Sequence, residues 1–147
     1  MRTIDTAIDI DAPPAIVWEH LTDFRSYPKW NPHVTAAEGD LSEGGALDIR
    51  VERAGVRPRE MTVTVTDVDP DRRLEWVGTL GHRWLFEGRH VLELEPLGDE
   101  RTRLHNREAV TGFLASLALT NEPERDYEAM NEALKRRVER RGNEIEA

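Results

Sequence analysis

The chain has 147 residues, with 29 acidic and 20 basic side chains and a net charge of −9. This length predicts one domain, residues 1–147, while the acidic balance argues against nucleic acid as a partner and the lack of cysteine excludes disulfides and thiolate metal sites. No stretch approaches the roughly 20 apolar residues of a membrane-spanning helix, and the first residues lack the apolar centre of a secretory signal, so we expect a cytoplasmic protein.

The chain opens with a predicted strand at residues 3–10. Ile4, Ile8 and Ile10 fall on one face there, and acidic residues fall on the other. A helix is predicted from residue 14 to residue 22, because proline in the first turn suits a helix start.

The segment at 24–34, FRSYPKWNPHV, combines aromatic and proline residues. The two prolines limit it to one short turn or helix. Tyr27 and Trp30 then have two interpretations. They either plug a core or form the rim of a cavity.

Six further strands are predicted from apolar residues at every second position. The turns between them are short and rich in glycine, proline and charged residues. Because parallel neighbours need long crossover connections, such turns predict an antiparallel meander. The predicted strands are 34–38, 46–53, 59–68, 73–80, 83–95 and 102–111.

A long helix is predicted to close the chain, with Asn121 as its N-cap. Its apolar stripe is narrow, so it cannot by itself fill a curved seven-stranded sheet. The remaining volume is taken by bulky side chains or by a cavity. The run at 112–120, the most apolar of the chain, is predicted to be a lid-like loop or a short helix, serving either as a gate over the cavity or as ordinary core. The stripe consists of Tyr127, Met130, Leu134 and Val138.

Five stretches carry a resemblance to a known family: IDIDAPPAIVWEHLTDFRSYPKWNP (8–32), VTDVDPDRRLEWVG (65–78), FEGRHVLELEP (86–96), TRLHNREAVTG (102–112) and MNEALKRRVE (130–139). They resemble the SRPBCC superfamily, also called START-like or Bet-v-1-like, in its polyketide cyclase/dehydrase branch. The resemblance implies an α+β helix-grip fold, in which a curved seven-stranded antiparallel sheet wraps around a long C-terminal helix, with two short helices after the first strand. It also implies a hydrophobic ligand cavity between sheet and helix. Members include lipid carriers, hormone receptors, aromatases, cyclases and chaperone activators, so the fold does not choose a function.

Strand parity brings a histidine and a glutamate together on the inward face of the sheet. If the turn at 96–102 centres the last hairpin, His90 lies opposite Glu108, and Leu92 lies opposite Asn106. A buried glutamate beside a histidine is unusual, and each would shift the other's pKa, which marks a candidate functional site. Three interpretations stay open: the pair satisfy each other or a helix backbone in a polar-lined core, they orient a polar group on an apolar ligand, or they act as general acid and base.

The preceding hairpin, centred near His82, is predicted to place Trp76 opposite Gly88. A glycine there would make room for the ring or bend the strand. The five histidines are scattered without metal-ligand spacing, so no metal and no cofactor are expected. The residues expected to contact a ligand are Trp30, Trp76, Trp84, Phe86, Gly88, His90, Leu92, Asn106, Glu108, Tyr127, Met130 and Leu134.

We therefore expect a protein that binds a small hydrophobic or amphipathic molecule, lipid- or polyketide-like, in an internal cavity. His90 and Glu108 would set the orientation of this ligand. One alternative is a polyketide cyclase or dehydratase-like enzyme that uses Glu108 or His90 as acid or base. A second is a chaperone-activator-like interaction protein in which the cavity is incidental. A homodimer is left open.

Overall fold

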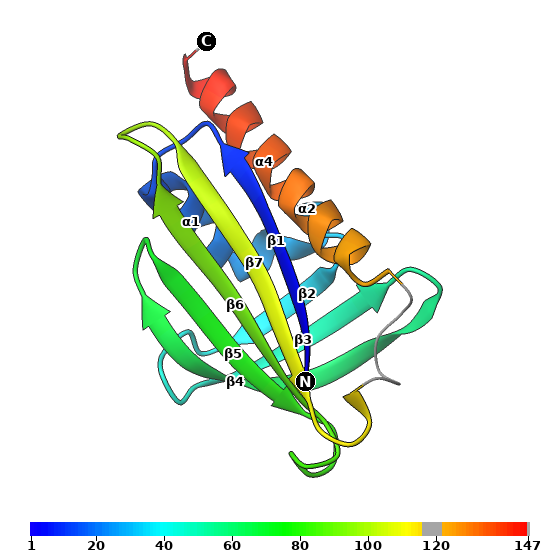
Figure 1. Cartoon of the computed structure of the whole chain (residues 1–147). Coiled ribbons are helices and arrows are strands. Elements are labelled where there is room, and N and C mark those ends of the chain that lie inside the picture. Colours follow the sequence, from blue (N-terminus) through cyan, green and yellow to red (C-terminus); the bar gives the residue numbers. More distant parts are fainter. Residues whose placement is uncertain (116–121, 147) are drawn as a thin grey trace.

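The computed structural model describes residues 1–115 and 122–146, without the side chains of 143–146 (Figure 1). Seven strands form one antiparallel sheet in the order β1-β7-β6-β5-β4-β3-β2, so the predicted meander is confirmed and β1 closes on β7. The strands are β1 (Arg2–Ile10), β2 (Val34–Gly39), β3 (Ala46–Arg53), β4 (Val56–Asp69), β5 (Arg73–Thr79), β6 (Glu87–Pro96) and β7 (Thr102–Thr111).

The long helix α4 (Glu124–Glu146) runs along β1, and the sheet curves around it (Figure 1). Three short helical elements follow β1: α1 (Pro14–Thr22), the 3₁₀ helix η1 (Phe24–Ser26) and α2 (Tyr27–Trp30). The helix-grip architecture is thereby confirmed. The predicted N-cap Asn121 and residues 116–120 of the apolar run lie outside the described residues.

One apolar core lies between the sheet and the helices. All four residues of the predicted α4 stripe are buried, and three of them join Val17 and Leu21 of α1 in the same cluster as the inward side chains of the strands. Tyr27 is fully buried, stacks edge-on against Phe24 and Trp30 at ring distances of 5.2 and 5.1 Å, and donates its hydroxyl hydrogen to the Leu21 carbonyl. These contacts favour a plug as the role of Tyr27.

The hairpin between β5 and β6 differs from its prediction. The backbone N–H groups of Leu85 and Phe86 both bond to the carbonyl of His82, so a turn occupies the start of the strand predicted at 83–95. Trp84, predicted within that strand and as a ligand contact on the inward face of the sheet, lies in this turn and is 61% exposed, so its predicted place on the inward face is wrong.

The longer turn also shifts the pairing by two residues. Trp76 pairs with His90, and Gly88 pairs with Gly78, so the predicted pairing of Trp76 with Gly88 is wrong. A Cβ atom on Gly88 would lie 3.2 Å from Oε1 of Glu108. The space that Gly88 leaves is therefore occupied by the carboxyl group of Glu108.

Candidate functional site

A closed ring of hydrogen bonds lies in the core between β1, β7 and α4. The Asn106 side chain accepts from Nε2 of His90 at 2.6 Å through Oδ1 and donates to Oδ1 of Asn131 at 2.8 Å through Nδ2. Asn131 donates to Oγ1 of Thr6 at 2.9 Å, and Thr6 returns to the Asn106 carbonyl at 2.8 Å. Since an amide oxygen only accepts, His90 carries its hydrogen on Nε2 and its lone pair on Nδ1.

His90 is held as a neutral imidazole. Burial lowers its pKa to about 4, and the bond to Asn106 opposes this only in part. Its ring stands edge-on to those of Trp76 and Tyr127, with centroids 5.0 and 5.6 Å apart. The predicted cross-strand pairing of His90 with Glu108 is confirmed, but the hydrogen-bond partner of His90 is Asn106. The two groups therefore do not satisfy each other, because the Glu108 carboxyl group turns over Gly88 instead.

Glu108 is a partly buried residue, and its Oε2 atom is shielded from water. Burial raises its pKa to about 8, and the charge of Arg53 opposes this shift without overcoming it. Its Oε2 atom is buried and makes no hydrogen bond to the part of the chain that the structure describes. At neutral pH the group is therefore mainly protonated, and it can donate a hydrogen bond.

Arg53 brings a positive charge to this region from the end of β3. Its charge acts on Glu108, His90, His33 and Tyr127. Burial raises the pKa of Tyr127 well above its ordinary value, and Arg53 opposes this by its charge and by hydrogen bonding. His33 packs on Tyr127 at a ring distance of 4.6 Å, and burial lowers its pKa to about 4.

Sequence reasoning missed Arg53, His33, Asn131 and Thr6. Arg53 had a usable signal, because it shares the parity of Leu47 and Ile49 and so belongs to the inward face of β3. Thr6 shares the parity of Ile4 and Ile10 in the same way. Nothing comparable marks His33, which follows an irregular proline segment.

Several residues predicted to contact a ligand lie in the middle of the sheet–helix interface. Trp76, Leu92, Met130 and Leu134 were expected to line a cavity, but they are almost fully buried in the main core cluster. Met130 also accepts a hydrogen bond from Asn106 at its sulfur, at 3.7 Å.

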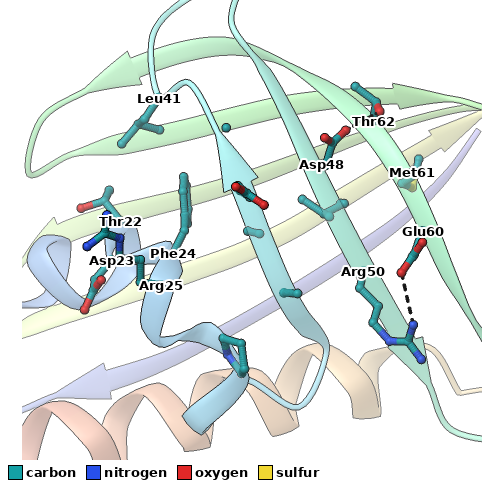
Figure 2. Close-up of a pocket in the computed structure, with 16 residues that line it drawn as sticks. Thr22, Asp23, Phe24, Arg25, Leu41, Asp48, Arg50, Glu60, Met61 and Thr62 are labelled. Atoms are coloured by element: carbon teal, nitrogen blue, oxygen red, sulfur yellow. Dashed lines mark hydrogen bonds and ion pairs between the residues drawn. The ribbon is translucent and has the colours of Figure 1, made fainter.

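A pocket of about 1110 Å³ lies elsewhere, between the α1–η1 corner and strands β2, β3 and β4 (Figure 2). Figure 2 shows Asp48, Arg50, Glu60 and Thr62 on its strand side, with Arg50 and Glu60 joined by an ion pair at 3.4 Å. None of the residues predicted to contact a ligand lines this pocket. Six of its sixteen lining residues are charged, and the rest include the apolar side chains of Phe24, Leu41, Ile49 and Met61.

A second apolar cluster lies next to Glu108, separate from the main core. It consists of Phe86, Val110 and Ala115, with Leu80 packed against them. The turn at 80–86 and the segment at 112–115 are joined by two backbone bonds of 2.8 Å, from Phe113 to Trp84 and from Leu114 to Leu85. Phe113 is 80% exposed, so these two segments form an apolar rim beside the carboxyl group.

The candidate site therefore consists of the polar residues that lie between the two apolar clusters. Of the predicted residues, the structure brings His90, Asn106 and Tyr127 together on the main-core side. It brings Glu108, Gly88 and Phe86 together on the other side. Trp84 lies on the rim. Trp30 lies apart from the site, at the end of α2, where it faces α4.

The described residues contain no group of three or more His, Cys, Asp or Glu side chains that could hold a metal ion. Within the same residues, no helix is long and apolar enough to cross a membrane.

Comparison with known proteins identifies the family. A family model described as polyketide cyclase / dehydrase and lipid transport matches residues 1–139. The chain belongs to this family. A search of curated proteins found no match.

Solved structures of similar fold include enzymes. The Zhui aromatase/cyclase from Streptomyces sp. R1128 has a TM-score of 0.73 and 21% identity, with 95% of this chain and 94% of that chain covered. A norcoclaurine synthase from Thalictrum flavum has a TM-score of 0.70 and 15% identity, with 96% of each chain covered. A protein of Nitrosomonas europaea has a TM-score of 0.75 and 16% identity, with 96% of each chain covered. Identities this low show the shared fold, and the function has to be argued from the site.

Proposed function

We propose that the protein binds a small hydrophobic or amphipathic molecule, lipid- or polyketide-like, with its polar group at Glu108. The observation that carries this proposal is the buried Oε2 atom of Glu108, which has no hydrogen-bond partner among the described residues. An unpartnered buried carboxyl group is costly for the fold, so its retention suits a group that meets a ligand. A ligand carbonyl or hydroxyl oxygen would accept the hydrogen that Glu108 carries at neutral pH.

The apolar part of the ligand would lie between the two clusters. The smaller cluster around Phe86 would form the cover, because the turn at 80–86 and the segment at 112–115 meet there beside Glu108. Apolar burial contributes roughly 25 cal/mol per Å², so the affinity would come from the rings and chains of the ligand. Glu108 would set its orientation, and the fixed ring of His90 would form part of the wall.

A cyclase or dehydratase-like reaction is the second candidate. The specific observation in its favour is that burial raises the pKa of Glu108 to about 8. A carboxyl group that is protonated near neutral pH can act as a general acid on a substrate oxygen. The family description includes both catalysts and carriers, so it is compatible with either candidate.

A pair of probes tests the binding proposal. 2-Naphthol carries a hydroxyl group on an apolar ring system, and naphthalene lacks the hydroxyl group. We expect 2-naphthol to bind the wild-type protein about tenfold more tightly, a difference of about 1.4 kcal/mol, measured by fluorescence titration. Glu108→Leu should remove this preference, because it removes the hydrogen-bonding group and keeps the apolar wall.

The matched control is Glu60→Gln, which changes an exposed carboxylate on β4 outside the site. It should preserve the preference for 2-naphthol. The proposal is overturned if neither probe binds saturably, or if Glu108→Leu keeps the tenfold preference. The enzyme candidate is distinguished by Glu108→Gln, which would retain binding and lose turnover of a substrate found by native mass spectrometry of the purified protein.

A further inference from the structure

A second pocket, of about 220 Å³, lies between α2 and α4 and is strongly basic. Figure 1 shows these two helices side by side. Five of its seven lining residues carry a positive charge. The lining consists of Lys29, Trp30, Ala133, Arg136, Arg137, Arg140 and Arg141.

The charges in this pocket are unusual for the molecule. The chain has a net charge of −9, and several arginines on the sheet are paired with carboxylates, as in Arg73 with Asp67 at 2.8 Å and Arg103 with Asp9 at 2.7 Å. In the pocket, only Arg136 has an ion pair with a described residue, a loose and exposed contact with Glu132 at 3.9 Å. The positive charge also acts on His20: burial lowers the pKa of His20, and the charges of Arg137 and Arg141 lower it further.

Two hydrogen-bond donors in the wall of the pocket lack acceptors. Nε1 of Trp30 and Nε of Arg137 are both shielded from water, and neither bonds to any described residue. Both groups can only donate, so only an acceptor can satisfy them. The edge-on stacking of Trp30 on the buried Tyr27 holds the indole in position.

We propose that this pocket binds an oxyanion, with phosphate as the chemical class. Arginines without an ion-pair partner among the described residues, and two N–H donors that are likewise unsatisfied there, are groups that phosphate oxygens bind. Guanidinium forms particularly strong charge-assisted bonds to phosphate. The volume lies below the roughly 300 Å³ at which pockets for drug-sized ligands begin. It therefore suits a phosphate group, either free or carried at the end of a larger molecule.

Titration with inorganic phosphate tests this site through tryptophan fluorescence, at constant ionic strength maintained with KCl. We expect a saturable change that is absent from Trp30→Phe, since Trp30 is the tryptophan in the pocket wall. Arg137→Gln should weaken binding at least tenfold. Arg141→Gln changes an exposed side chain that does not support the fold, and it should weaken binding about threefold.

The matched control is Arg125→Gln, which alters an exposed arginine of α4 that is paired with Glu122, outside the pocket. It should leave phosphate binding unchanged. A parallel titration with methyl phosphate separates the two sources: tighter binding of phosphate favours the free anion, tighter binding of methyl phosphate favours a carried group, and either result supports the site. The site is rejected if no saturable change occurs, if KCl alone reproduces it, or if Arg137→Gln and Arg141→Gln both bind like Arg125→Gln.

Discussion

Glu108→Gln is expected to make the protein more stable at pH 8 and to leave its stability at pH 5 nearly unchanged. The pKa of Glu108 is about 8 in the folded protein and 4.5 without the fold's influence, and burial is the main cause of the shift. Between these values the folded state holds a proton that the unfolded state has released. The free energy of unfolding therefore falls as the pH rises from 4.5 to 8. At about 1.4 kcal/mol per pKa unit, the loss between pH 4.5 and pH 8 is on the order of 4 kcal/mol.

The two buried histidines act in the opposite direction. Burial lowers the pKa of both His33 and His90 from 6.5 to about 4, so between these values the unfolded state binds protons that the folded state does not. Their effect raises the free energy of unfolding with pH up to about 6.5. Together with Glu108, they predict maximal stability near pH 6.5 and a decline toward pH 8.

Urea unfolding at pH 5, 6.5 and 8 measures this profile. Glu108→Gln should remove the decline in stability above pH 6.5 and keep the rise in stability from pH 5 to pH 6.5. The control Glu60→Gln, at an exposed position, should reproduce the wild-type profile. A wild-type protein that is equally stable at pH 6.5 and pH 8 would contradict the burial of Glu108 as an acid.

Local patterns predicted the elements whose ends are set by short turns. The strands at 46–53 and 102–111 and the helix at 14–22 have the predicted bounds. The register of β6 against β7 is also confirmed, because the turn between them is short and apolar residues alternate on both sides. Parity then placed His90 and Glu108 on the inward face.

The remaining differences between prediction and structure concern features that the alternation of apolar and polar residues does not encode. The turn between β5 and β6 is held by backbone bonds to His82, and apolar residues within it imitate a strand. Parity gives the face on which Glu108 lies, but not that its carboxyl group turns over Gly88 and away from His90. The volume between the sheet and α4 depends on the curvature of the sheet. The sequence gives the sizes of the side chains but not this curvature, so it does not predict whether a cavity remains.

The polar ring in the core leads to the second large prediction. Asn106→Leu should lower the free energy of unfolding by about 3 kcal/mol, although leucine nearly matches asparagine in size. The substitution leaves Nε2–H of His90 and Oδ1 of Asn131 buried without their partners, and each such group costs about 1–3 kcal/mol. The control is Thr62→Val, which removes an exposed bond to Asp48 and should change stability by less than about 0.5 kcal/mol.

A double-mutant cycle separates the ring from simple packing. Asn131→Leu should also destabilise strongly, because it leaves Nδ2 of Asn106 with only the weakly accepting sulfur of Met130 as a partner. The double variant Asn106→Leu with Asn131→Leu removes both partners of that bond, so its loss should be smaller than the sum of the single losses by at least about 1 kcal/mol. Losses that add would mean that the two amides act independently. They would also mean that the neutral His90 in the site is positioned by packing against Trp76 and Tyr127 more than by the hydrogen bonds of the ring.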